Sequence, residues 1–371
     1  MSTKGKDNGE GSARPLAEQG TNRVSTGRHL LRFAALDLAY FSGYARSMAH
    51  HRGGAGIVLR FERVRPPFRT VFQPLQSREI SPDFLDRMIS ALKRWDYDLI
   101  SMDDVCQRVV TMAAPRRFVA LTFDGGYRDW LTFGYPVLAR HAVPFTLYLS
   151  SALTDGIGEA WWLALEQIVA RENRIYLEID RKEMFFSAAN PDEKQTLFDY
   201  LERWLRSLAP ADLSHAARDL CRRYSADLSS LTREAFLNWS ELEVLAADPN
   251  VTIGSAGVNY SALSKLREAD ARREVKMGKA VTEAALGRSI NHFAYPFGDG
   301  IAWDRRHMAM VEEAGFSSAV STIPAVVEAE GGSSLYALPR LAWDGRMRSL
   351  RHLRVLSSGA TFPRRSPIAP G

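Results

Sequence analysis

Short apolar segments rich in β-branched and aromatic residues alternate with helical patterns along most of this chain, and that alternation restricts the fold more than any other feature. Helical segments separate most of the expected strands, and Ser81 followed by Pro82 is typical of a helix N-terminus. Strands that alternate with helices predict an α/β fold with a largely parallel sheet, open or closed into a barrel. The segments expected to form strands are 56–61, 97–101, 118–123, 144–149, 251–254, 291–295 and 316–320.

The alternation is confined to residues 53–350, which we expect to form the main domain, and it is interrupted between about residues 156 and 249. The interrupted part is predicted to be mostly helical, apart from a strand at 175–179, and to form an insertion over one end of the sheet. Residues 351–371, which are rich in Pro, Arg and Ser, are expected to form a flexible tail.

Two different segments precede the main domain. Residues 1–28 are rich in Gly, Ser, Asn, Lys and Glu, a composition that predicts a disordered tail. Residues 29–52 are more apolar, and their helical spacing predicts an amphipathic helix that packs on the domain. A helix that lies on a membrane surface is the alternative. A transmembrane segment is not expected, because Arg32, Asp37 and Arg46 interrupt the apolar residues.

Composition excludes several classes of protein. The 371 residues are 46% hydrophobic and 25% charged, which is typical of a globular chain. The formal charge of +5 is spread over many arginines instead of one stripe, so we do not expect a nucleic-acid partner. Cys106 and Cys221 are expected to be buried, without a disulfide or a histidine partner. The N-terminus lacks the apolar segment of a secretory signal, which predicts a cytoplasmic location.

The segment L-T-F-D-G-G-Y-R-D, residues 121–129, marks the expected position of the functional site. An apolar strand ends in Asp124, and two glycines follow it. Because α/β enzymes carry their reactive groups at the carboxyl ends of strands, Asp124 is a candidate catalytic residue.

This segment resembles the T-F-D-D-G signature of the polysaccharide deacetylases, which form the NodB-homology family or carbohydrate esterase family four. The resemblance extends from about residue 30 to residue 353. It implies a distorted (β/α) barrel of the polysaccharide deacetylase type with a helical insertion, and hydrolysis of acetyl groups from N-acetylated sugars. Further segments similar to motifs of the family occur in the same order at 63–66, 161–166, 252–263, 293–298 and 338–340.

The resemblance also implies which positions hold the catalytic groups, and most of them are substituted in this chain. Members of the family use a divalent metal such as Zn, bound by one Asp and two His, with a neighbouring Asp as base and a separate His as acid. Asp124 matches the base, whereas Glu62 stands at the position of the acid. The three ligand positions hold Gly125, Ala256 and Tyr260, so we expect no metal or other cofactor.

The substitutions leave three functional hypotheses open. The first is a deacetylase-like protein that has lost most metal-dependent activity but retains a carbohydrate-binding groove, since losing one oxyanion donor already slows catalysis roughly 100- to 1000-fold. The second is an active deacetylase rebuilt around Asp124 and Glu62 as base and acid. The third is a non-catalytic interaction protein. A structural role for Asp124, as the cap of a backbone turn, is the alternative to a catalytic one.

Side chains near the expected strand ends are candidates for binding the sugar. Trp162 and Tyr295 are expected to be exposed near the mouth of the barrel, where aromatic faces stack on sugar rings, and packing in the core is the alternative. The resemblance adds Pro296, Phe297 and Arg340 to this set. The expected partner is an acetylated oligo- or polysaccharide, with a carbohydrate enzyme as a protein partner.

Overall fold

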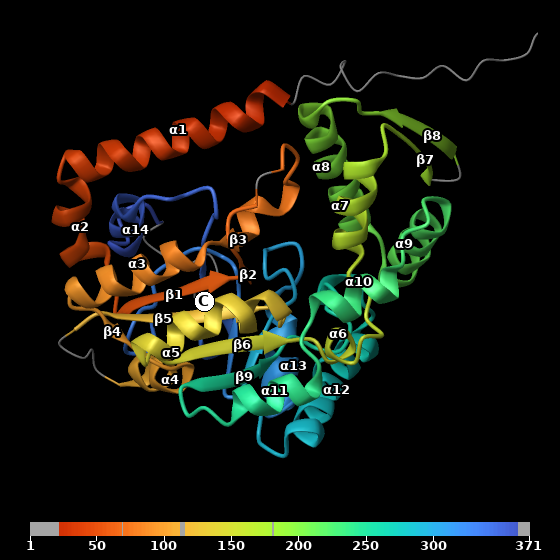
Figure 1. Ribbon diagram of the computed structural model, residues 1–371. Coiled ribbons are helices and arrows are strands. Elements are labelled where there is room, and N and C mark those ends of the chain that lie inside the picture. Colours follow the sequence, from red (N-terminus) through yellow and green to blue (C-terminus); the bar gives the residue numbers. More distant parts are fainter. Residues whose placement is uncertain (1–21, 69, 112–115, 180–181, 363–371) are drawn as a thin grey trace, which may run out of the picture.

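A curled sheet of parallel strands lies at the centre of the computed structural model, which describes residues 22–362 except 69, 112–115 and 180–181 (Figure 1). Within the described residues, seven strands follow one another in the order β11-β10-β9-β6-β5-β1-β12, and β4 pairs with β5 as an eighth. The strands are β1 (Gly56–Phe61), β4 (Asp98–Leu99), β5 (Phe118–Asp124), β6 (Phe145–Leu149), β9 (Val251–Ser255), β10 (His292–Ala294), β11 (Ser318–Val320) and β12 (Leu341–Ala342).

The sheet closes toward a barrel through residues 338–342. Leu338 forms a parallel bridge with Val320 at the end of β11, and β12 then pairs in parallel with β1. The segment therefore joins the two edges of the sheet. This arrangement confirms the distorted (β/α) barrel that the sequence predicts.

The strand β5 is buried along its whole length because it lies between β1 and β6. Parallel sheets are covered on both faces, which explains the continuous apolar run from Phe118 to Phe123. In the core, the rings of Phe61 and Phe123 stack at a centroid distance of 5.2 Å. Asp124 is the last residue of β5, so the strand carries a carboxylate to the carboxyl edge of the sheet.

Helices pack around the outside of the sheet (Figure 1). The predicted helix at Ser81 and Pro82 is confirmed: the Ser81 side chain accepts a hydrogen bond from the Phe84 backbone at 3.2 Å. The apolar face of this helix, including Leu85 and Ile89, is buried against the barrel. The helices that surround the sheet are α3 (Pro82–Arg94), α4 (Met102–Val110), α5 (Tyr135–His141), α11 (Trp239–Ala246), α12 (Glu268–Leu286) and α13 (Arg305–Glu313).

The insertion lies beyond the carboxyl ends of the central strands, at the right of Figure 1, and has a core of its own. A strand occurs at the predicted place, but it pairs with a second strand that the sequence analysis assigned to helix. The expectation is wrong there because antiparallel pairing with the neighbouring strand determines the backbone. The elements are α6 (Ser151–Thr154), α7 (Trp161–Arg171), β7 (Arg174–Ile179), β8 (Lys182–Ser187), α8 (Pro191–Ser207), α9 (Pro210–Arg223) and α10 (Leu228–Ala235).

Two helices precede the barrel, α1 (Asn22–Phe41) and α2 (Tyr44–Arg52), and a turn at Gly43 with a φ of 73° separates them. The first begins inside the tail expected for residues 1–28, and the rest of that tail lies outside the described residues. One face of α1 packs on α14 (Leu350–Ser357), as Figure 1 shows. No helix in the described part of the chain is long and apolar enough to cross a membrane.

The helix α14 corrects the flexible tail expected for residues 351–371. Leu353 and Leu356 are buried, and the helix packs against α1, α2 and α3. The expectation is wrong up to residue 362 because these apolar side chains complete the core, and residues 363–371 lie outside the described chain. Short elements occur at β2 (Arg63–Val64), β3 (Glu79–Ile80), the 3₁₀ helices Pro74–Arg78, Leu263–Lys265 and Leu335–Ala337, and the π-helical turn Trp130–Gly134.

Candidate functional site

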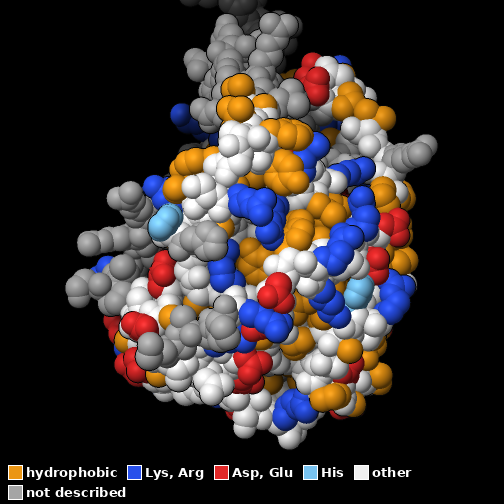
Figure 2. All heavy atoms as spheres, turned by 90° about the vertical axis from the view of Figure 1, so that its left-hand side faces the viewer, with side chains coloured by type: hydrophobic (Ala, Val, Ile, Leu, Met, Phe, Trp, Pro, Cys, Tyr) orange, Lys and Arg blue, Asp and Glu red, His pale blue; other side chains and the backbone are white. Residues whose placement is uncertain are grey.

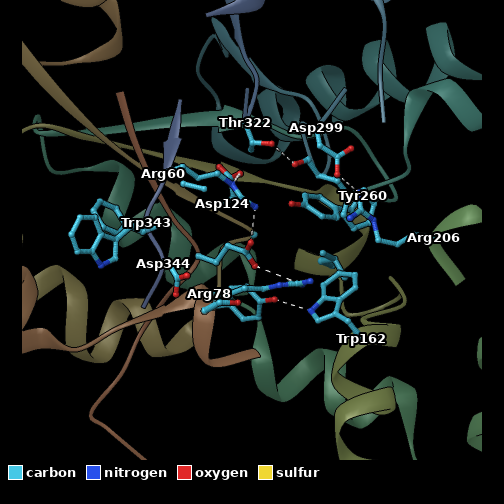
Figure 3. A pocket seen from close by; sticks show the side chains of 18 of the residues that line it. Arg60, Arg78, Asp124, Trp162, Arg206, Tyr260, Asp299, Thr322, Trp343 and Asp344 are labelled. Carbon is cyan, nitrogen blue, oxygen red and sulfur yellow. Dashed lines mark hydrogen bonds and ion pairs between the residues drawn. The ribbon is translucent and has the colours of Figure 1, made fainter. Parts of the chain in front are cut away.

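A cavity of about 340 Å³ lies at the carboxyl ends of β1 and β5, between the barrel and the insertion (Figure 3). Asp124 and Glu62 both line it, so the structure brings the two predicted catalytic carboxylates into one site. Its described walls carry as many basic as acidic side chains: Arg32, Arg60, Arg78, Arg206, Glu62, Asp124, Asp299 and Asp344.

Two arginines hold Asp124 from both sides. The Nη1 and Nη2 atoms of Arg340 donate to Asp124 Oδ1 at 2.6 Å and Oδ2 at 2.9 Å, and Arg60 Nε donates to Oδ2 at 2.5 Å. Burial alone would raise the pKa of Asp124, but the two guanidinium groups lower it below the ordinary value. The carboxylate is therefore ionised, and both of its oxygens already accept charged hydrogen bonds.

The second carboxylate shares one of these arginines. Arg60 Nη2 donates to Glu62 Oε1 at 2.7 Å, and Arg78 lies 4.0 Å from Glu62 Oε2. Burial opposes the charge of Arg60, but Glu62 and Asp124 together raise its pKa well above the ordinary value. Asp124 and Glu62 thus form two ends of an ion-pair network centred on Arg60.

The position after Asp124, where the resemblance implies a metal-binding aspartate, has little room for a side chain. Gly125 has a φ of 98°, a conformation that side chains rarely adopt, and a Cβ atom there would lie 2.9 Å from Tyr127 Cε2. The Tyr127 ring is held in place, because it stacks on Phe236 at 4.6 Å and its hydroxyl accepts a hydrogen bond from Trp162 Nε1 at 2.8 Å. The backbone conformation and the packing of Tyr127 therefore favour glycine at position 125.

The other two positions where the resemblance implies metal ligands also lack a metal-binding side chain. Ala256 is fully buried and offers only a methyl group. Tyr260 lines the cavity, and burial raises the pKa of its phenol, which stays neutral and is a poor ligand. Across the described residues, no three His, Cys, Asp or Glu side chains gather closely enough to hold a metal ion. These residues do not fit the divalent metal that the resemblance implies.

Two of the predicted sugar-binding residues lie in the core. Tyr295 is only 1% exposed: its ring stacks on Trp303 at 4.1 Å, and its hydroxyl donates to the Tyr336 carbonyl at 2.9 Å. The prediction that Tyr295 is exposed is wrong because the residue directly follows β10 and packs into the barrel. Pro296 is buried as well, and neither residue lines the cavity.

The other three predicted residues surround the cavity in different ways. Trp162 lines the cavity but is almost fully buried, so the prediction that it is exposed is also wrong. Its indole packs in the core of the insertion and donates a hydrogen bond to the Tyr127 hydroxyl. Arg340 is fully buried behind the cavity and binds Asp124. Phe297 is half-buried and lines the cavity directly.

An aromatic pair at the mouth of the cavity has an unusual backbone. Tyr260 and Phe297 have φ values of 56° and 60°, in the left-handed region that bulky side chains rarely adopt. Their rings meet at a centroid distance of 5.1 Å, and Arg206 lies 4.5 Å above the Phe297 ring. Backbone strain of this kind clusters at binding and active sites. The same three residues also line a second groove of about 840 Å³, which continues between α12 and the start of α9.

Solved structures of deacetylases share this fold. Streptococcus pyogenes deacetylase PplD, in complex with acetate, matches 81% of this chain and 97% of its own, with a TM-score of 0.53 and 15% identity. IcaB from Ammonifex degensii matches 82% of this chain and 98% of its own, with a TM-score of 0.50 and 13% identity. The de-N-acetylase from Aggregatibacter actinomycetemcomitans matches 81% of this chain and 98% of its own, with a TM-score of 0.50 and 12% identity. Such low identities establish the fold alone.

A sequence comparison finds a similarity to one family over part of the chain. A family model described as polysaccharide deacetylase matches residues 217–319. Over these residues, which make up less than a third of the chain, the sequence is similar to that family. The matched part contains β9, β10 and two of the positions where the resemblance places metal ligands, Ala256 and Tyr260. No curated protein sequence matches the chain significantly.

Several residues of this candidate site escaped the sequence analysis. Arg60 had a detectable signal, because it is the one charged residue in the apolar segment 56–61. Tyr127 lies within the recognised motif, but its packing against Gly125 depends on contacts with the insertion. Arg78 and Arg206 reach the cavity from separate elements, and nothing in their local sequence predicts it.

Proposed function

We propose that this chain is a member of the polysaccharide deacetylase family that binds an acetylated oligo- or polysaccharide without performing the metal-dependent hydrolysis of the family. The observation that carries the proposal is the set of residues around Asp124. Arginines hold both oxygens of Asp124, and Gly125, Ala256 and Tyr260 occupy the ligand positions.

Hydrolysis of an acetamide needs an activated water, charge stabilisation at the developing oxyanion and a proton for the leaving amine. A metal normally supplies the first two requirements in this family. At the centre of this site, Asp124 has a lowered pKa and fully engaged oxygens, so it is a weak base. Arg60 offers a positive charge, but that charge is already neutralised by Asp124 and Glu62.

Three features support binding of a sugar. The cavity and the adjoining groove together offer an extended concave surface, which suits a chain of sugar units. Tyr260 and Phe297 provide half-buried aromatic faces at the boundary between them. Carboxylates and guanidinium groups line the cavity and can hydrogen-bond sugar hydroxyls. The proposal keeps the cytoplasmic location and the carbohydrate enzyme as protein partner that the sequence predicts.

Calorimetric titration with N-acetylglucosamine oligomers tests the proposal. We expect saturable binding that Tyr260→Ala weakens at least about tenfold, which corresponds to about 1.4 kcal/mol. Tyr176→Ala is the matched control, because Tyr176 is 53% exposed on the hairpin of the insertion and lies outside both cavities. Metal analysis and acetate release are measured on the same preparation. Stoichiometric Zn together with metal-dependent acetate release would overturn the proposal.

A deacetylase rebuilt around Asp124 and Glu62 is the second candidate, because both carboxylates line one cavity. It requires acetate release that needs no added metal and disappears in both Asp124→Asn and Glu62→Gln. A non-catalytic interaction protein remains the third candidate. It would show neither acetate release nor binding to any acetylated sugar.

A further inference from the structure

The helix α1 is apolar on two opposite faces. Its inner face packs on α14: Leu36 is buried, and the Phe33 ring stacks on His352 at 5.4 Å. The outer face points away from the molecule and consists of Leu31, Ala34, Ala35, Leu38 and Phe41, which recur at helical spacing. We call these five residues the α1 outer face.

The α1 outer face is strongly exposed. Leu31, Leu38 and Phe41 are 72%, 71% and 69% exposed, and Tyr40 near the end of α1 and Tyr44 at the start of α2 are exposed as well. Contiguous apolar side chains exposed on a surface often mark an interaction site. Packing on α14 covers one apolar face of α1 and leaves the other face open to a partner.

The charges around this face are almost all positive. Between residues 22 and 52 the sequence contains one acidic residue, Asp37, and several arginines. Asp37 is already engaged, because Arg351 Nε lies 3.2 Å and His352 Nε2 3.4 Å from its Oδ1. Arg46 is exposed and has no hydrogen-bonded or ion-paired partner among the described residues, whereas Arg32, which is also exposed, lines the cavity. Figure 2 shows this side of the molecule, where hydrophobic side chains gather beside Lys and Arg side chains.

We propose that the α1 outer face binds the surface of an anionic lipid bilayer, with α1 lying in the plane of the membrane. Leucine and phenylalanine side chains would enter the boundary between headgroups and acyl chains, and Arg46 would meet lipid phosphates. Tyr40 and Tyr44 suit the same interface, where aromatic residues with a polar tip are enriched.

The charge pattern favours a bilayer over a second copy of this chain. A twofold contact through α1 and α2 would bring two sets of unpaired arginines together, and Asp37, the acid of these helices, is already bound. Anionic headgroups supply the missing negative charge. The inference does not depend on the ligand of the cavity.

Vesicle flotation of the full chain tests this inference. We expect the protein to float with phosphatidylcholine vesicles that contain phosphatidylglycerol, and to float less as the salt concentration rises. Leu38→Asp should weaken this binding at least about tenfold, and Arg46→Glu should also weaken it. Val244→Asp is the matched control: Val244 is 74% exposed on α11, and its substitution should leave binding unchanged.

All of these side chains are exposed, so circular dichroism and thermal unfolding of the variants should match the unmodified chain. Equal flotation of Leu38→Asp and the unmodified protein would overturn the inference. So would a protein that does not float but forms a dimer that Leu38→Asp dissociates, since a second copy would then cover this face.

Discussion

At the scale of single residues, the charge of Asp124 depends on Arg340. The carboxylate is almost fully buried, and Arg340 is fully buried behind it. A buried charge that loses its partner is strongly destabilising, whereas replacing the whole pair by uncharged groups is often tolerated. Loss of either residue alone should therefore destabilise the fold more than replacement of both.

We expect Arg340→Met to lower the free energy of unfolding by about 3–5 kcal/mol, because it leaves Asp124 with Arg60 alone. Combining it with Asp124→Asn should recover part of the loss. Arg140→Met is the control, since Arg140 binds Asp86 in an exposed ion pair and should contribute less than about 1 kcal/mol. Urea denaturation measures all four proteins, and equal costs for Arg140→Met and Arg340→Met would contradict the expectation.

The glycine after Asp124 gives a second test at this scale. Gly125 and Gly287 both have positive φ, but a Cβ atom at Gly287 meets nothing within 4 Å, whereas at Gly125 it lies 2.9 Å from Tyr127. We expect Gly287→Ala to cost about 1 kcal/mol from backbone strain alone. Gly125→Ala should cost about 1–3 kcal/mol more through overpacking against the ring. Similar unfolding midpoints in urea would mean that Tyr127 moves aside freely.

At the scale of elements, local patterns predicted the barrel well. The bounds of β1 agree with the prediction, because a buried parallel strand leaves a continuous apolar run. The strand β12 escaped prediction, since two residues give no periodicity and its pairing with β1 is long-range.

The candidate site was likewise predictable only where the signal is local. Asp124 could be found because it stands at the end of an apolar strand. The roles of Arg60 and Arg340 were missed because they bind it from 64 and 216 positions away.

The first residue of β10 ties this strand to α4. His292 Nδ1 lies 2.9 Å from Ser318 Oγ, and Nε2 lies 3.1 Å from Asp103 Oδ1. Burial opposes protonation of the imidazole, but Asp103 and Cys106 outweigh it and raise its pKa from 6.5 to about 9. Cys106 thus lies beside a histidine, contrary to the sequence prediction, and it is half-buried and free.

This histidine should make stability depend on pH. Because the folded protein holds the His292 proton more tightly than the unfolded chain, the stabilisation is complete below pH 6.5 and is lost as pH rises through about 9. Urea denaturation at a series of pH values should show the free energy of unfolding falling across that range. Asp103→Asn removes the carboxylate and should flatten this dependence. A profile that is level for the unmodified chain would refute the assignment.

At the scale of the whole molecule, the candidate site belongs to two parts of the chain. Asp124 and Glu62 come from the barrel, whereas Trp162 and Arg206 come from the insertion. The sequence predicts an insertion over one end of the sheet, but which of its side chains reach the cavity depends on how the two cores pack. The helix α1 touches the same space, because Arg32 lines the cavity.

The ion pair between Arg340 and Asp124 also has a consequence for how the chain folds during synthesis. Its partners are 216 positions apart, and β1 pairs with the last strand, β12. A ribosome that adds about 5–20 residues per second needs roughly 10–40 s to travel from one partner to the other. Throughout that interval the nascent β5 ends in a carboxylate that lacks its main counter-charge, which favours its continued hydration. Barrel closure should therefore be a late event that follows release of the C-terminal part from the ribosome.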